Sequence, residues 1–254
     1  MRTKLVTLII AITVLAAMMI ALERISTGRE FSRVKGWYPR AALLNIGQAI
    51  AAFIGAYTWD IWLQDLALYD LSDEPRYLRC IIGYLVVTFV YYWWHRARHS
   101  SHILWNLFHQ IHHSPQRLEI ITSFYKHPLE IIANGFLTSL LLYVLLGLDP
   151  TTVTIVVAMT AIAELFYHWN INTPYWLGFF IQRPESHCVH HRRHRHTANF
   201  SDLPLWDMIF GTFHNPKIVD FSCGFAEDRE LKLKSMLAFK NVNKPKKTKH
   251  SCNQ

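Results

Sequence analysis

Five long apolar stretches most constrain what this chain can fold into. They run over residues 5–22, 41–57, 80–94, 131–148 and 151–163. A helix needs roughly 20 mostly apolar residues to cross about 30 Å of hydrocarbon, and the stretches reach that length when their flanks are included. The sequence therefore predicts an all-α fold, a polytopic bundle of membrane helices with four to five spans.

Two other interpretations of these stretches stay open. Arg2 and Lys4 precede the first stretch, as in a secretory signal, but the stretch is longer than the usual signal core and no clear small-residue cleavage site follows it. The others could be buried helices of a soluble protein. Five such stretches in a chain of 254 residues, 51% of them hydrophobic and 17% charged, favour the membrane bundle.

The last two stretches predict a helical hairpin over residues 130–169. Only the four residues from Gly147 to Pro150 join them. Gly147 suits the end of one helix, Asp149 can cap the next, and Pro150 suits a first helical position. So short a link forces the two helices to run antiparallel.

The charges between the stretches predict an orientation. Residues 23–40 carry five Lys/Arg, residues 64–77 carry four acids against one arginine, and the chain from residue 175 onward carries 13 Lys/Arg. Because positive loops stay cytoplasmic, we expect the N-terminus and residues 64–77 outside and the other two segments inside. The net charge of +8 then needs no nucleic-acid partner, and no nucleic-acid-binding motif appears.

The 15 histidines cluster on the predicted cytoplasmic side. HRARH at 95–99 follows the third stretch, HQIHH at 109–113 and HCVHH at 187–191 form two HxxHH groups, and His168 follows the fifth stretch. Spacings of three and four put side chains on one helical face. A zinc ion takes four protein ligands or fewer, so this many imidazoles suit two metal ions. Imidazole ligands fit iron, zinc, copper or nickel.

Together these motifs resemble the fatty acid hydroxylase/sterol desaturase superfamily of integral-membrane di-iron enzymes. KHPLE at 126–130, NF at 199–200 and LWDMIFGT at 205–212 also resemble motifs of that family. Two departures, Tyr125 where an arginine is common and the short basic segment before Asn199, bear on the substrate rather than on the metal.

The resemblance covers about residues 80–215 and implies a division of the chain. Residues 1–79 would form N-terminal membrane spans and loops. Residues 80–215 would form the catalytic domain, with a cytoplasmic helical cap that carries the histidine groups. Residues 216–254 would form a basic cytoplasmic tail, in which the lysine-rich run at 244–250 either contacts the anionic leaflet or is solvated.

The resemblance also implies ligands and residues that orient them. The implied metal ligands are His95, His99, His109, His112, His113, His168, His187, His190 and His191. His127 is a further candidate, as a ligand or as a residue that positions one. Glu164 lies one helical turn before His168, and because a carboxylate there needs a partner, we expect it to bond to a ligating imidazole. Asp207 and Asn170 are further candidates for orienting the ligands.

The implied activity is an O₂-dependent non-haem di-iron monooxygenase of a lipid or lipid-like substrate. Hydroxylation of a C–H bond is preferred by analogy within the family, and desaturation of a sterol-like or acyl substrate is the alternative. The cofactors would be two iron ions, with O₂ as co-substrate and a separate redox partner as electron donor. A metal-binding or transport protein is the rival class, which needs ligands near mid-membrane, and the spans hold few polar residues.

Overall fold

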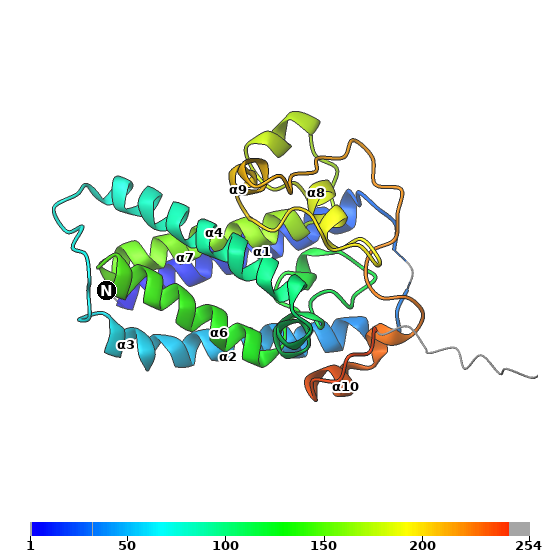
Figure 1. The fold of residues 1–254 in the computed structure, drawn as a ribbon, viewed down its shortest axis with the longest axis horizontal. Coiled ribbons are helices and arrows are strands. Elements are labelled where there is room, and N and C mark those ends of the chain that lie inside the picture. The colour runs from blue at the N-terminus through cyan, green and yellow to red at the C-terminus, as the bar shows by residue number, and fades with distance from the viewer. Residues whose placement is uncertain (1, 32, 244–254) are drawn as a thin grey trace, which may run out of the picture.

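The structure, a computed structural model, describes the backbone of residues 2–31 and 33–243, and the side chains of those residues from 10 onward except residue 12. This part of the chain is a bundle of long helices with a cap of short helices and loops at one end (Figure 1). The α-helices are α1 (Arg2–Ile25), α2 (Trp37–Ala56), α3 (Trp59–Leu63), α4 (Arg76–Ser100), α5 (His102–Leu104), α6 (Pro128–Ser139), α7 (Pro150–His168), α8 (Pro184–His190), α9 (Pro204–Ile209) and α10 (Leu233–Leu237). The π-helical turns are η1 (Trp105–His109) and η3 (Leu140–Leu145), and the 3₁₀ turns are η2 (Ile120–Thr122), η4 (Tyr175–Phe179) and η5 (Arg229–Leu231). The predicted all-α fold is confirmed.

Four helical segments are long and apolar enough to cross a membrane: Trp37–Leu63, Arg76–Ser100, Pro128–Leu145 and Pro150–His168. The shortest has 18 residues, which is about 27 Å at 1.5 Å per residue. Leu43 and Phe53 on α2 are 64% and 65% exposed, as side chains that face lipid would be. Four of the five predicted stretches therefore form helices of spanning length. The first stretch lies in α1, and whether α1 also crosses the membrane stays a prediction.

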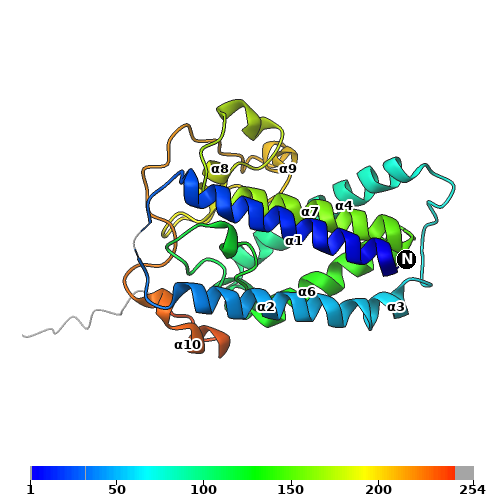
Figure 2. The same cartoon turned by 180° about the vertical axis from the view of Figure 1, so that it is seen from behind.

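The long helices alternate in direction, so the loops fall at two opposite ends of the bundle (Figure 2). At one end Arg79 forms an ion pair with Asp149 at 2.7 Å, which joins the start of α4 to the hairpin link. At the other end the Glu23 carboxylate accepts the backbone N–H of Ile120 at 2.9 Å, which joins the end of α1 to the cap. The basic loop after α1 therefore shares one end with the cap, while the acidic loop before α4 lies at the other end.

The hairpin of α6 and α7 forms as predicted. Gly147 has a φ of 59°, in the left-handed region that glycine adopts without steric cost. The Asp149 side chain accepts the backbone N–H groups of Thr151 and Thr152 at 3.0 and 3.2 Å, and Pro150 opens α7. Apolar side chains from α4, η3 and α7 then close the core between the spans.

Part of the segment expected as a basic tail, residues 216–254, is packed instead. Phe225 and Met236 are fully buried in a cluster with Trp37 at the start of α2. Apolar side chains of this size gain too much from burial to stay in a solvated tail. The basic run predicted to touch the membrane lies in residues 244–254, outside the described residues. The predicted domain boundaries stay predictions.

Candidate metal centre

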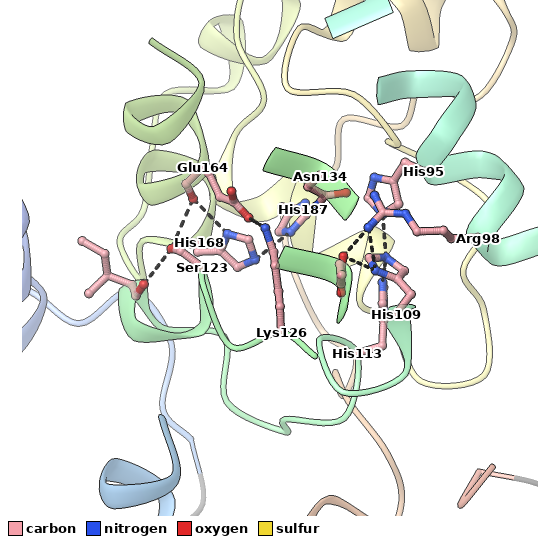
Figure 3. Close-up of polar contacts among 12 residues, drawn as sticks. His95, Arg98, His109, His113, Ser123, Lys126, Asn134, Glu164, His168 and His187 are labelled. Atoms are coloured by element: carbon pink, nitrogen blue, oxygen red, sulfur yellow. Dashed lines mark hydrogen bonds and ion pairs between the residues drawn. The ribbon is translucent and has the colours of Figure 1, made fainter. Parts of the chain in front are cut away.

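Histidine side chains converge where the bundle meets its cap (Figure 3). His95 and His99 lie on the last two turns of α4, and His168 is the last residue of α7. The HCVHH group begins on α8, whose first residue is Pro184. The HQIHH group occupies the end of the π-helical turn η1 and the turn after it, rather than a regular α-helix. Ends of elements far apart in the sequence thus meet at one place.

The nine histidines of the motifs form two groups. Within each group, one ring nitrogen of every member lies within 4.8 Å of the others. The first group is His95, His99, His109, His113 and His190, and the second is His112, His168, His187 and His191. The structure thus brings together all nine histidines that the motifs named as ligands, and divides them into two sets.

Hydrogen bonds to backbone carbonyls fix which ring nitrogen faces the centre of each group. The Nδ1 atoms of His95, His168 and His190 lie 2.7, 2.9 and 2.8 Å from carbonyl oxygens. A carbonyl oxygen only accepts, so each Nδ1 donates, and a neutral imidazole carries only one N–H. The Nε2 atoms of these three rings therefore carry lone pairs that point into the groups.

Two rings of the first group approach each other through their ring nitrogens. Nε2 of His95 lies 2.8 Å from Nε2 of His109. Nδ1 of His109 lies 3.0 Å from the Glu130 carboxylate and 3.3 Å from a guanidinium nitrogen of Arg98. Metal–nitrogen bonds of 2.0–2.1 Å at a right angle would separate two ligand atoms by about 3.0 Å. The separation between the two Nε2 atoms fits two ligands on one ion.

The second group has a similar spacing, and burial keeps the rings neutral. Nε2 of His187 lies 3.1 Å from Nε2 of His168 and 3.1 Å from that of His191. Burial lowers the pKa of His187 and His191 well below its usual value, and lowers that of His190 to about 3. Because metal ligation needs neutral imidazole, the site is ready to bind metal at neutral pH. Both groups fit a metal ion.

Glu130 is a site residue that the sequence reasoning did not single out. It is fully buried, forms an ion pair with Arg98, and orients His109 through the Nδ1 contact. Carboxylates that hold the second nitrogen of a ligating imidazole fix its orientation and raise its basicity. The KHPLE motif contained this signal, but the motif alone does not show which of its side chains faces a ligand.

Glu164 does not form the expected side-chain bond to a ligating imidazole. Its carboxylate pairs with Lys126 rather than with an imidazole, and its backbone carbonyl accepts the bond from Nδ1 of His168 (Figure 3). The physical reason is that an ammonium is a stronger partner for a carboxylate than a neutral imidazole is. A carboxylate near the end of a span does have a partner, as expected, but the partner is a lysine.

Asp207 holds the loop that orients His95. Its two carboxylate oxygens accept the backbone N–H groups of Phe200 and Ser201 at 2.8 and 2.9 Å, and Asp207 is fully buried. The carbonyl of Phe200 in turn accepts the bond from Nδ1 of His95. Asp207 thus acts on a ligating imidazole through the backbone, one step further away than expected.

Two candidates from the sequence do not lie at the histidine groups. Asn170 donates from its side chain to the carbonyl of Arg29 at 2.8 Å, which ties the end of α7 to the loop after α1. His127 caps α6 by accepting the backbone N–H of Leu129 at 3.0 Å, and its Nε2 lies 3.3 Å from the carbonyl of Leu237. Both ring nitrogens of His127 are thus engaged away from the two groups, and the structure does not support it as a ligand.

A cavity of ≈ 260 Å³ reaches the histidines from inside the bundle. Its lining runs from Trp59 near the far end, past apolar side chains of α2, α4 and α7, to His95 and His187. The polar end also holds Lys126 and Asp202. Burial, and then the nearby negative charge of Glu164, raise the pKa of Asp202 to about 7. The sequence reasoning missed Asp202 because no motif marks it.

The fold and the site define a class: a polytopic membrane helix bundle whose capped end carries two histidine groups able to hold metal. The family model described as fatty acid hydroxylase matches residues 80–212. This chain belongs to the fatty acid hydroxylase family, within the superfamily that its motifs resembled. No solved structure gives a significant match.

Curated relatives agree with that family. The chain is 32% identical over 144 residues to alkylglycerol monooxygenase of Homo sapiens, a match that covers 54% of this chain and 31% of the relative. It is 31% identical over 146 residues to ornithine lipid hydroxylase OlsE of Rhizobium tropici, covering 56% and 44%. It is 28% identical over 130 residues to sphingolipid C4-hydroxylase sur2 of Schizosaccharomyces pombe, covering 50% and 44%. The chain thus spans less than half the length of each of these relatives.

Proposed function

We propose that this protein is a membrane-bound, O₂-dependent di-iron hydroxylase that acts on a C–H bond of a lipid chain. The observation that carries the proposal is the pair of buried histidine groups, each with its ring nitrogens gathered at one point, at the end of a cavity inside the bundle. The names of the three relatives, a monooxygenase and two lipid hydroxylases, support the substrate class and the reaction.

Each part of the chain has a defined task in this proposal. The histidine groups would hold two iron ions, which together with O₂ supply the oxidising power for an unactivated C–H bond. The carbonyls of Phe200 and Glu164 and the carboxylate of Glu130 fix the ring orientations. The apolar walls of the cavity position the lipid chain and exclude water, while Lys126 and Asp202 hold protons at the polar end.

The reaction also sets what must come from outside. One oxygen atom of O₂ enters the C–H bond and the other leaves as water, which consumes two electrons and two protons. We propose that a separate redox partner supplies the electrons on the cytoplasmic face, since the positive charge of the loops supports a cytoplasmic position for the histidine end. That membrane is the cytoplasmic membrane of a bacterium or the endoplasmic reticulum of a eukaryote.

Metal content and lipid products together test the proposal. The protein purified in detergent after iron loading should hold about two irons per chain. His112→Ala and His190→Ala, one in each group, should each lower that content, whereas His102→Ala, an exposed histidine outside both groups, should not. A metal-free wild-type protein, or equal iron in all variants, contradicts the metal site.

The product identifies the reaction. Lipids from cells that express the wild-type chain should contain a species with one added oxygen atom, and that species should be absent with His112→Ala. A species that has instead lost two hydrogen atoms would show desaturation and overturn the hydroxylase assignment. Iron bound without any change of lipids under any growth condition would favour a metal-binding protein without catalysis.

A further inference from the structure

Another cavity, of ≈ 390 Å³, is lined mainly by the end of α1 and the loop that follows it, and by Asn170 just after α7. Its lining is dominated by charge. The lining residues include four arginines and three glutamates: Arg24, Arg29, Arg33, Arg117, Glu23, Glu30 and Glu119. Neither the motifs nor the proposed reaction uses any of them, so the cavity needs its own explanation.

Arg29 is the residue that sets this cavity apart. All three of its guanidinium nitrogens are buried, and none has a hydrogen-bond partner among the described residues. Buried charges in proteins are normally paired, because an unpaired one loses its hydration without compensation. A guanidinium with three unused nitrogens in a polar cavity therefore indicates an anionic partner that the described chain does not supply.

Two of the nearby glutamates bond to groups other than Arg29. Glu119 forms ion pairs with Arg117 and, at 3.6 Å, with Arg24. One oxygen of Glu23 accepts the backbone N–H groups of Ile120 and Asn170, both at 2.9 Å, and its other oxygen is buried with no hydrogen-bond partner among the described residues. Neither carboxylate contacts Arg29 by a hydrogen bond, so the positive charge at Arg29 remains available.

The backbone holds Arg29 in place. Its carbonyl accepts the side-chain N–H of Asn170 at 2.8 Å, and the N–H of Gly28 donates to the carbonyl of Asn170 at 2.8 Å. Gly28 lies so close to Ile171 that a Cβ there would come within 2.5 Å of its carbonyl carbon. The loop is thus fixed against the end of α7, and a ligand would meet a guanidinium that is already positioned.

We propose that Arg29 is the anchor of a phosphate-binding site. The planar fork of a guanidinium matches two oxygens of a phosphate group, and the exposed Arg33 adds a second positive charge to the lining. The loop after α1, which supplies most of the lining, lies at the same end of the bundle as α8 (Figure 2). The positive charge of the loops predicts that this end faces the anionic cytoplasmic leaflet. The phosphate belongs either to a phospholipid headgroup or to free phosphate.

Thermal unfolding of the full-length protein in a maltoside detergent, which carries no phosphate, tests the site. Inorganic phosphate and dihexanoyl phosphatidylglycerol are titrated separately, with chloride keeping the ionic strength constant. A ligand that binds only the folded protein raises the unfolding midpoint. Arg29→Gln is compared with Arg195→Gln, which removes the same charge from an exposed side chain outside the cavity.

We expect the midpoint of the wild type and of Arg195→Gln to rise, and Arg29→Gln to need an about tenfold higher concentration for the same rise, since charged hydrogen bonds are lost. A response to both probes or to inorganic phosphate alone identifies free phosphate as a sufficient ligand. A response to the phospholipid alone identifies the headgroup. The proposal is overturned if neither probe stabilises the wild type, or if Arg29→Gln and Arg195→Gln respond alike.

A second measurement decides the matter if Arg29→Gln does not fold. Wild-type crystals soaked in selenate, a tetrahedral oxyanion like phosphate, should show an anomalous selenium peak within hydrogen-bonding reach of the Arg29 guanidinium. A peak only elsewhere, or none, overturns the site. Because the iron content of the same preparations is measured separately, the result does not depend on the proposed hydroxylase activity.

Discussion

Single backbone carbonyls decide what the imidazoles of this site can bind. The carbonyl of Phe200 turns His95, and that of Glu164 turns His168, so that Nε2 points into a group in both cases. A side-chain substitution at Phe200 leaves this carbonyl in place, whereas a shift of its loop does not. The ligand geometry therefore depends on whatever holds the loop, which is the carboxylate of Asp207.

We predict that Asp207→Asn weakens metal binding in the first group more than in the second. The amide keeps the size of the carboxylate but is neutral and accepts through only one oxygen, so one of the two backbone N–H groups, at Phe200 or Ser201, loses its acceptor and the other keeps only an uncharged one. Loss of a hydrogen bond that helps to orient a metal ligand typically costs about 10–100-fold in metal affinity. Iron retained against a chelator, measured over time, should fall to about one ion per chain.

The matched control for this prediction is Asp228→Asn, which makes the same change on an exposed side chain. It should retain iron like the wild type. Equal retention in Asp207→Asn would show that the loop keeps its place without the carboxylate. Equal loss from both groups would show that Asp207 supports the whole cap rather than His95.

A second prediction concerns pH and Asp202. Its pKa in the fold is raised to about 7 by burial and by the charge of Glu164, against an ordinary value of about 3.9. The folded protein therefore binds a proton that the unfolded chain has released, and the stability linked to this proton is lost as pH rises from about 4 to about 7. Asp202→Asn, which cannot ionise, should raise the unfolding midpoint relative to wild type more at pH 8 than at pH 5.

Thermal scans of both proteins at the two pH values check this sign. A difference between variant and wild type that does not change with pH would show that Asp202 is ionised in the fold throughout that range. Asp228→Asn, which makes the same change on an exposed side chain, is again the control.

At the residue scale, the sequence predicted which histidines come together better than it predicted the residues that contact them. The spacing of HRARH and of the two HxxHH groups was enough, because three- and four-residue steps bring rings together on any helical turn. The partner of Glu164 was not predictable, because Lys126 is 38 positions away and reaches it only through the fold. His127 looked like a ligand until its two nitrogens were found to bond with the backbone of Leu129 and Leu237.

At the element scale, the hairpin link controls how α6 and α7 meet, and we predict that Gly147→Ala is destabilising. The left-handed φ of 59° costs an alanine about 1–2 kcal/mol. In addition, a Cβ at this position would lie 2.2 Å from the carbonyl oxygen of Tyr69, so the acidic loop must move away. Unfolding in detergent should show the loss in the free energy of unfolding.

Gly47→Ala on α2 is the control, because a Cβ there meets nothing within 4 Å. A helical alanine in open space should be neutral or stabilising by up to about 1 kcal/mol. If both variants unfold alike, the link does not depend on the glycine conformation. Iron content should be unchanged in Gly47→Ala, since the residue lies outside both histidine groups.

The elements themselves were largely predictable, and their irregular turns were not. Length and apolar character mark the spans because hydrocarbon imposes both, and the turn residues at Gly147 and Pro150 mark the link. The π-helical turns at Trp105–His109 and Leu140–Leu145 left no such signal. A π turn inserts one extra residue into a helix, and what favours it is tertiary packing rather than local propensity.

At the scale of the whole molecule, function depends on the two ends being different. The histidine groups, the basic loop after α1 and the Arg29 cavity share one end, and the acidic loop and the hairpin link form the other. A cavity inside the bundle connects the apolar interior with the metal end. In the proposed reaction, a lipid chain would approach the histidine groups from the hydrocarbon side, and an electron donor would approach from the aqueous side.

The charge pattern predicted this separation of the ends, and it also predicts which end is cytoplasmic. We expect a membrane-impermeant maleimide to label Ser72→Cys in intact cells, and Thr197→Cys only after the membrane is permeabilised. Both positions are exposed. Ser72 belongs to the loop before α4 and Thr197 to the loop after α8, and these loops lie at opposite ends of the bundle (Figure 1). Both cysteine variants are made in a chain that also carries Cys252→Ser, so that the introduced cysteine is labelled in preference to the other three, which are buried. The reverse labelling pattern would place the histidine groups outside, which would contradict electron delivery from the cytoplasm while leaving the metal site itself intact.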